Sequence, residues 1–236
     1  MSVIWHDLEC GRYAEDLPFW RQLAAESGGP VLDVGAGTGR VALELARAGH
    51  KVTALDLDAV LLDELEARAA GLAVDTVLGD ARTFALGRQF ALCIVPMQTI
   101  QLLGGPGRRA FLARAREHLL DRGLLAIALA DELEVFEVPE GDVGPLPDVC
   151  ELDGVVYSSR PTAVRAEAGG FVLERTRETV TVDGSLSALY DEIRLDSLGA
   201  DQLEHEGVRA GLRPAGQARI AATQDYVGSV VVMLRA

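Results

Sequence analysis

The chain has 236 residues, of which 49% are hydrophobic and 25% are charged, and its formal net charge is −14 at pH 7. These values are typical of a globular protein that is large enough for one domain with an appended subdomain. A nucleic-acid-binding protein normally carries a basic face that neutralises phosphates. The negative charge therefore favours a small molecule over a nucleic acid as the ligand.

Membrane association and compartment can also be judged from the sequence. No apolar stretch approaches the roughly 18–20 residues that span a bilayer, and the first residues lack the basic and apolar regions of a secretory signal. The three cysteines, Cys10, Cys93 and Cys150, lie far apart and form no CxxC pair, which argues against a disulfide framework and a zinc site. We therefore expect a cytoplasmic protein with no metal centre and no membrane partner.

Short apolar segments alternate with helical patterns in the first half of the chain. The first, fourth and fifth apolar segments are almost entirely apolar, as expected for strands buried on both faces of a parallel sheet. Strand–helix alternation of this kind predicts a doubly wound α/β sheet. The predicted strands are 31–35, 51–56, 73–79, 90–96 and 123–130, and the predicted helices are 16–29, 41–49, 59–69 and 108–120.

The second half begins with a different pattern. Residues 149–197 are rich in Val, Thr and Tyr that alternate with polar residues, and they are interrupted by Gly-Gly and Asp-Gly turn signals. This pattern predicts an antiparallel meander. The Pro- and Gly-rich stretch 137–149 before it is the expected hinge. A helix at 199–212 and two strands at 218–224 and 228–236 are predicted to complete the chain.

A glycine cluster follows the first strand in the segment Asp33-Val34-Gly35-Ala36-Gly37-Thr38-Gly39-Arg40. Such a cluster lets the backbone approach a ligand closely. The dinucleotide fingerprint GxGxxG would need a third glycine where the chain has Arg40, which disfavours a nicotinamide oxidoreductase. The spacing is GxGxG instead, and an acidic residue, Asp33, lies two positions before the first glycine.

This segment resembles the first motif of class I S-adenosylmethionine-dependent methyltransferases. The resemblance covers residues 31–130 and the last two strands, and it implies S-adenosylmethionine as the cofactor. It implies a Rossmann-like, doubly wound, seven-stranded sheet with an antiparallel β insertion after the fifth strand and an N-terminal helical cap. It also implies that the glycine loop passes beneath the ribose and the amino-acid tail, while Asp33 attracts the tail ammonium.

Further positions extend the resemblance around the expected cofactor. It implies that Asp56 accepts both ribose hydroxyls. Asp80 is expected to accept from the adenine amine, with the backbone of Ala81 beside the ring. Residues expected near the cofactor are Tyr13, Asp33, Gly35, Ala36, Gly37, Arg40, Asp56, Leu57, Asp80, Ala81, Arg82 and Pro96. Two of these assignments have simpler alternatives, because Tyr13 could merely pack against Phe19 and Trp20, and Arg40 could merely begin a helix.

The methyl acceptor is less clearly specified. The helical cap and the β insertion are similar to small-molecule N- and O-methyltransferases, including glycine and aminosugar N-methyltransferases. Enzymes that methylate planar amines or amides carry (Asp/Asn)-Pro-Pro-aromatic after the fourth strand, whereas this chain has Val95-Pro96-Met97-Gln98. No histidine stands out as a general base, because His118 is expected near the surface. The candidates for a catalytic role are Gln98, Gln101, Glu132 and Tyr157.

These observations predict a methyltransferase with a divided domain. Residues 1–130 and 198–236 are assigned to the cofactor domain with its helical cap, and residues 131–197 to an insertion that caps the substrate. The insertion is also a candidate surface for a homodimer, because exposed strand edges invite association. The alternative function is a non-catalytic S-adenosylmethionine-binding sensor or partner subunit, since the motifs report binding only.

Overall fold

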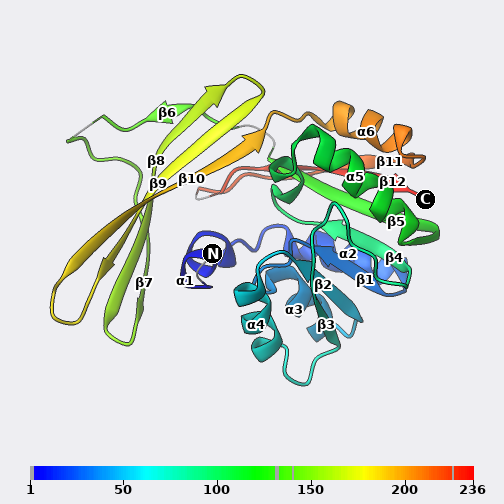
Figure 1. The fold of residues 1–236 in the computed structure, drawn as a ribbon, viewed down its shortest axis with the longest axis horizontal. Coiled ribbons are helices and arrows are strands. Elements are labelled where there is room, and N and C mark those ends of the chain that lie inside the picture. Colours follow the sequence, from blue (N-terminus) through cyan, green and yellow to red (C-terminus); the bar gives the residue numbers. More distant parts are fainter. Residues whose placement is uncertain (1–2, 131–132, 140, 225) are drawn as a thin grey trace. The chain divides into compact units, whose positions relative to one another are not determined.

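The computed structural model describes residues 3–130, 133–139, 141–224 and 226–236. The chain divides into two compact units (Figure 1). Residues 13–130 and 198–236 form the first unit, and residues 4–12 and 133–197 form the second. The sequence placed residues 4–12 with the cofactor domain, whereas the contacts of the folded chain place them with the insertion. None of the helices in the described part of the chain is long and apolar enough to cross a membrane.

The first unit is built on one seven-stranded sheet, as the sequence predicted. The strand order is β11-β12-β5-β4-β1-β2-β3, and β1 pairs in parallel with both β2 and β4. β12 runs antiparallel to β5, and β11 runs antiparallel to β12. The order reverses between β1 and β4, which is where open α/β sheets bind ligands. The strands are β1 (Val31–Val34), β2 (Val52–Asp56), β3 (Val74–Leu78), β4 (Phe90–Val95), β5 (Leu119–Ala130), β11 (Arg213–Ile220) and β12 (Ser229–Arg235).

The predicted strand at 218–224 is displaced from the observed β11, which spans Arg213–Ile220. β11 is a polar edge strand with mostly exposed side chains, so it lacks the apolar run that marks the buried strands. Its pairing with β12 shifts register between Pro214 and Gly216, where Gly216 has a φ of 106°. A bulge at a glycine therefore interrupts the alternation on which the prediction depended.

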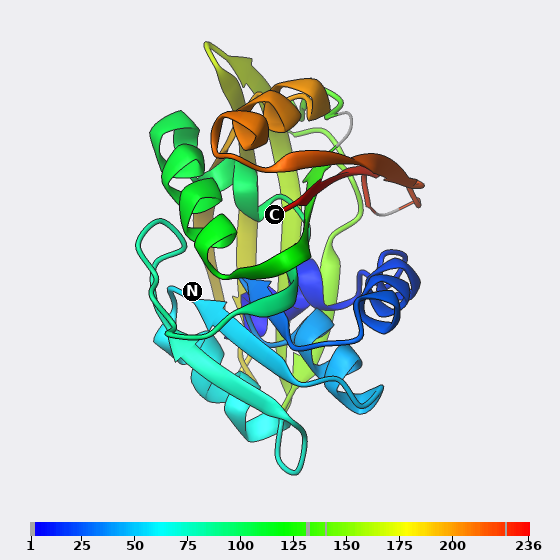
Figure 2. The same ribbon diagram turned by 90° about the vertical axis from the view of Figure 1, so that its right-hand side faces the viewer.

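Helices cover both faces of this sheet (Figure 2). Along β1, Val31 packs into one buried apolar cluster, whereas Leu32 and Val34 pack into the other. This division explains why the strand is apolar throughout. One cluster receives side chains from α2 (Leu17–Ser27), α3 (Arg40–Arg47) and α4 (Ala59–Arg68), and the other from α5 (Gly104–Glu117) and α6 (Ala200–Arg209).

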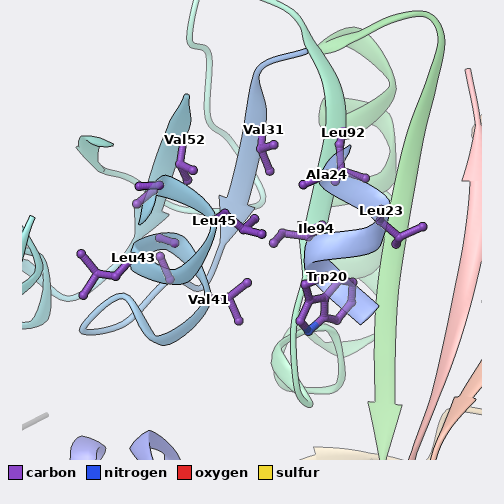
Figure 3. Close-up of a cluster of buried hydrophobic side chains, with 14 of the residues drawn as sticks. Trp20, Leu23, Ala24, Val31, Val41, Leu43, Leu45, Val52, Leu92 and Ile94 are labelled. Carbon is purple, nitrogen blue, oxygen red and sulfur yellow. The ribbon is translucent and has the colours of Figure 1, made fainter. Parts of the chain in front are cut away.

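The first cluster is shown in Figure 3, where Trp20 and Leu23 of α2 lie near Ile94 of β4, and Leu45 of α3 lies near Val31 of β1. Trp20 and Leu45 have no exposed surface. Burying side chains of this size contributes roughly 1.5–3 kcal/mol each, so the cluster fixes α2 and α3 on the sheet. It thereby fixes the loop that leads from β1 into α3.

The second unit contains an antiparallel sheet, in agreement with the predicted insertion. Its strand order is β10-β9-β8-β6, and β7 also pairs with β8. The paired segments are connected by short turns at the Gly-Gly and Asp-Gly positions that the sequence indicated. The strands are β6 (Phe136–Glu137), β7 (Asp148–Leu152), β8 (Val155–Glu167), β9 (Gly170–Val180) and β10 (Leu186–Asp196).

The N-terminal segment folds onto this second sheet. It forms α1 (Val3–His6) and the π-helical turn η1 (Asp7–Gly11), neither of which the sequence predicted. The Glu9 carboxylate, buried in the second unit, accepts hydrogen bonds of 2.7 and 2.8 Å from Arg177 and one of 2.8 Å from Ser159. Trp5 packs edge-on against Tyr157, with 5.5 Å between the ring centroids. These contacts are absent from the local sequence pattern because their partners lie about 150 residues away.

Candidate cofactor-binding site

The glycine loop lies at the carboxyl end of β1, beside the point where the strand order reverses. Gly35 and Gly39 have φ values of 73° and 91°, a region that favours glycine. A Cβ atom on Gly35 would lie 2.5 Å from Thr99 Cγ2, and one on Gly39 would lie 2.1 Å from Leu65 Cδ1. These two glycines therefore also allow close packing inside the protein, a role that their spacing in the sequence does not predict.

Asp33 is the most unusual acidic residue of the site. It is 1% exposed, and neither of its carboxylate oxygens has a hydrogen-bond partner of good geometry among the described residues. Burial raises the pKa of Asp33 to about 7; the Arg40 guanidinium lowers it, and the Asp56 carboxylate raises it further. A buried carboxylate without well-formed hydrogen bonds is costly, so the site favours a ligand group that donates hydrogen bonds to Asp33.

Asp56 lies at the end of β2 and faces the glycine loop. Its Oδ2 accepts a hydrogen bond of 2.7 Å from the backbone N–H of Gly37, and its Oδ1 accepts one of 3.0 Å from the N–H of Asp58. Asp58 in turn caps α4, where its side chain accepts from the N–H groups of Val60 and Leu61. Asp56 is thus held in a fixed orientation beside the loop at the position expected for the ribose hydroxyls.

The residues expected around the adenine ring lie at the ends of β2 and β3. Leu57 is 68% exposed, and Ala81 is partly buried. The Asp80 carboxylate accepts three hydrogen bonds from the Arg82 side chain and one from its backbone N–H. These bonds hold the pKa of Asp80 below its usual value. Asp80 therefore has a partner within the chain, and its contact with an adenine amine stays a prediction.

Arg40 follows the glycine loop and forms a buried ion pair. Its guanidinium donates two hydrogen bonds, of 2.5 and 2.7 Å, to the carboxylate of Asp16 and one of 2.7 Å to the backbone carbonyl of Tyr13. The Asp16 carboxylate also accepts from the indole N–H of Trp20. The pair connects the start of α2 to the start of α3. The structure thus gives Arg40 a structural role. Its contact with the carboxylate of the S-adenosylmethionine tail stays a prediction.

A small pocket of about 30 Å³ opens at the end of β4, near the start of β12. Pro96, which is buried, begins the connection after β4, and its carbonyl accepts a hydrogen bond from the Thr99 hydroxyl. The pocket is lined by Tyr13, Met97, Gln98, Ala130, Tyr226, Val227 and Ser229. Tyr226, Val227 and Ser229 were not named from the sequence, because no motif marks the turn between the last two strands.

The four catalytic candidates occupy different environments. Gln98 lines the pocket. Gln101 is buried, and its amide oxygen accepts a hydrogen bond of 2.8 Å from the backbone N–H of Ala130, which indicates a structural role. Tyr157 belongs to the second unit, where it contacts Trp5. Glu132 lies outside the described residues.

Two other side chains of the first unit, His118 and Cys93, are of residue types that often act in catalysis, and both are buried. His118 is buried rather than near the surface: its Nε2 accepts from the Leu86 N–H and its ring packs against Phe84. Cys93 is fully buried, and burial raises the pKa of its thiol, so it is inert. Among the described residues, no cluster of His, Cys, Asp and Glu has the arrangement of a metal site.

Known methyltransferases resemble this chain in sequence and fold. Residues 31–123 match the methyltransferase domain family. A comparison with curated proteins found no significant match. The glycopeptide N-methyltransferase MtfA, solved in complex with S-adenosyl-L-homocysteine, is 27% identical, with a TM-score of 0.63 over 92% of this chain and 86% of its own.

Two other solved structures share the fold at lower identity. CalS10, an amino pentose methyltransferase from Micromonospora echinaspora, is 20% identical, with a TM-score of 0.72 over 99% of this chain and 97% of its own. The sugar N-methyltransferase KedS8 from a Streptoalloteichus species is 19% identical, with a TM-score of 0.74 over 99% of this chain and 92% of its own. The matched segment, 31–123, contains the glycine loop and Asp33, Asp56 and Asp80. Residues 31–123 therefore match the methyltransferase domain family, and the solved methyltransferases named above share the fold of this chain.

Proposed function

We propose that this protein transfers the methyl group of S-adenosylmethionine to a nitrogen or oxygen atom of a small molecule. The observation that carries the proposal is Asp33, a buried carboxylate without a hydrogen-bond partner of good geometry among the described residues. An ammonium group supplies both the charge and the N–H donors that such a carboxylate lacks. The amino-acid tail of S-adenosylmethionine carries this group.

The residues of the first unit divide the work of holding the cofactor. Asp33 binds the tail ammonium, and Asp56, oriented by the N–H groups of Gly37 and Asp58, binds the ribose hydroxyls. When bound, S-adenosylmethionine supplies an electrophilic methyl carbon: the acceptor's lone pair forms the new bond as the sulfur–carbon bond breaks, sulfur keeps the electron pair, and an amine acceptor releases a proton. The protein's contribution is then mainly positioning, which is worth up to about 7–11 kcal/mol in favourable cases.

An amine is the first acceptor class to test. The structural neighbours named above include methyltransferases of an amino pentose, of sugar nitrogen and of glycopeptide nitrogen. The residues after β4 are Pro96-Met97-Gln98, which lack the motif of enzymes that methylate planar amines and amides. We further propose that the second unit caps the acceptor. The residues proposed to bind the cofactor all belong to the first unit, which leaves the second unit free for this role.

The test is a methyl-transfer assay read by release of S-adenosylhomocysteine, with panels of aliphatic amines, phenols and carboxylates. Turnover of any acceptor supports the enzyme, and the panel identifies the methylated class. The proposed cofactor role of Asp33 is tested separately by calorimetry with Asp33→Asn. If the wild-type chain binds S-adenosylmethionine tightly but methylates no acceptor in any panel, the non-catalytic binding module becomes the better description.

A further inference from the structure

The pocket at the end of β4 has a strained backbone beside it. Met97 adopts a φ of 54°, in the left-handed region that a bulky side chain rarely enters. A residue held there is strained, and such strain persists where surrounding contacts enforce it, often at functional sites. Met97 also lines the pocket. The strain and the cavity are independent observations that mark the same place.

Tyr13 forms one wall of this pocket. The Arg40 guanidinium lies over its ring, 5.1 Å from the ring centroid, and the ring of Tyr226 contacts it, with 5.0 Å between the two centroids. Tyr13 is 4% exposed, and its hydroxyl faces the Ser229 side chain without forming a hydrogen bond of good geometry to any described residue. A buried hydroxyl in this state is available to a ligand group that enters the pocket.

Tyr226 is held in place by the turn between β11 and β12. The Tyr226 N–H donates a hydrogen bond of 2.9 Å to the Thr223 hydroxyl, and the Thr223 N–H donates one of 2.9 Å to the Tyr226 carbonyl. These reciprocal bonds hold Tyr226 to Thr223, and Ser229, the first residue of β12, also lines the pocket. The turn therefore delivers an aromatic ring and a hydroxyl to the same small cavity.

Among the described residues, the pocket lining is uncharged and mixes apolar with polar side chains. Tyr13, Gln98 and Ser229 supply oxygen atoms that accept hydrogen bonds, and the Tyr226 ring adds an electron-rich face that attracts cations. No Lys or Arg that could hold an anion is among the described residues of the lining. Its volume of about 30 Å³ exceeds the roughly 10–15 Å³ that one water needs, so an amino group with its carbon fits. This chemistry suits an aliphatic amine and disfavours a carboxylate.

We propose that Tyr226 and Ser229 complete an acceptor subsite, with Tyr13 and Gln98, that takes the amino group of a small aliphatic amine, and that Tyr226 limits the size of that amine. The inference rests on the proposed methyl transfer and adds the residues that would bind its acceptor. It gives the turn between the last two strands a role in acceptor selection. Tyr226 acts here as a specificity-determining residue, and the cofactor residues Asp33 and Asp56 are separate from it.

Amine binding can be measured without turnover. The chain has three methionines, so labelling their ε-methyl groups with ¹³C gives a simple NMR spectrum in which Met97→Leu assigns the Met97 signal. Ethanolamine is titrated into the protein saturated with S-adenosylhomocysteine. We expect the Met97 signal to shift and the Met233 signal, from the middle of β12, to stay in place. Sodium acetate, the matched anion, should shift neither signal.

Variants then test Tyr226 itself. We expect Tyr226→Ala to weaken the ethanolamine-dependent shift about tenfold or more, to raise KM rather than lower kcat for the amine that the wild-type chain methylates, and to admit bulkier amines. Tyr226→Phe keeps the ring and should restore wild-type behaviour. Val208→Ala, an exposed position on α6, is the control. S-adenosylhomocysteine affinity should change less than about twofold in all three variants.

Two outcomes overturn the inference. One is a Met97 signal that does not respond to ethanolamine in the wild-type chain, and the other is a Tyr226→Ala variant with unchanged KM, acceptor range and amine titration. The proposed methyl transfer fails by a different result, namely absence of cofactor binding or of S-adenosylhomocysteine release. The two failures are therefore distinguishable.

Discussion

The Asp56 carboxylate accepts a hydrogen bond of 2.7 Å from the backbone N–H of Gly37, and this bond connects the end of β2 to the glycine loop after β1. The two residues are 19 positions apart in the chain. Because β1 and β2 are parallel neighbours, their carboxyl ends lie at the same edge of the sheet, and the acid and the loop meet there. The contact orients the carboxylate before any ligand binds.

Asp56→Ala should weaken S-adenosylmethionine binding by about 1–3 kcal/mol, because the ribose hydroxyls and the Gly37 N–H lose their common acceptor. Calorimetry measures the affinity, and circular dichroism confirms the fold. Asp58→Ala is the matched control, since it removes the cap of α4 and should lower the melting temperature without a comparable loss of affinity. Equal affinity of Asp56→Ala and the wild-type chain would refute the ribose assignment.

Asp33 should make cofactor binding depend on pH. Its pKa is raised to about 7, so the carboxylate that attracts an ammonium group becomes ionised between pH 6 and pH 8. We expect affinity for S-adenosylhomocysteine to rise about tenfold over this range, as the ionised fraction increases. Asp33→Asn should bind weakly with no such rise, and it corrects for titration of the ligand itself. A parallel pH dependence in the two proteins would contradict the prediction.

The same pKa has a consequence for stability. The folded state holds the Asp33 proton up to about pH 7, whereas the unfolded chain releases it near pH 4. The folded state therefore binds more protons between these values, and this residue's contribution to the free energy of unfolding falls as pH rises from about 4 to 7. Urea unfolding at pH 5 and pH 7.5 measures this contribution. The free energy of unfolding of Asp33→Asn minus that of the wild-type chain should be larger at pH 7.5.

Breaking the buried pair of Arg40 and Asp16 should be costly. Arg40→Met leaves the Asp16 carboxylate buried without its cation, which costs about 3–5 kcal/mol, whereas the double variant Arg40→Met/Asp16→Leu should recover most of this loss. Arg21→Met, which breaks an exposed pair with Glu44, should cost less than about 1 kcal/mol. Denaturant unfolding measures all three variants. A loss of similar size in Arg40→Met and Arg21→Met would mean that the buried pair is not important for stability.

Replacing the second unit should separate cofactor binding from methyl transfer. The segment 4–12 depends on that unit through Glu9 and Trp5, so the variant begins at Tyr13 and carries a Gly/Ser linker in place of residues 133–197. We expect S-adenosylmethionine affinity within about tenfold of the wild-type value, or 1.4 kcal/mol, and no methyl transfer. Retained transfer would remove the capping role, and a collapse of affinity would show that the second unit contributes to cofactor binding.

The edge of the second sheet is the predicted surface for a homodimer. β10 is the edge strand, and its Leu186, Leu189 and Tyr190 side chains are 64%, 63% and 61% exposed. Exposed apolar edges tend to pair with another chain. Light scattering after gel filtration should give a dimer mass for the wild-type chain and a monomer mass for Leu189→Lys, with Val208→Lys on α6 as the control. A monomeric wild-type chain at tens of micromolar would exclude this homodimer.

The sequence by itself determined the architecture of the cofactor domain. Strands such as Val31–Val34 are apolar along their whole length because both faces are buried, and the acid before the glycines has a spacing that few ligands require. Both signals are local, since each is contained in one strand or one turn. The resemblance carried by this spacing implied the seven-stranded sheet and S-adenosylmethionine, and the alternation over residues 149–197 predicted the antiparallel insertion.

Only the tertiary structure decided the contacts between distant segments. Arg40 pairs with Asp16, Glu9 pairs with Arg177, and Tyr226 meets Tyr13 across more than 200 residues of chain. A single Arg, Glu or Tyr in a polar stretch gives no sign of its partner, because the partner is selected by the packing of whole elements rather than by local spacing. For the same reason, Gly35 and Gly39 could be recognised as glycines that a loop requires, but not as the positions where Thr99 and Leu65 leave no room for a side chain.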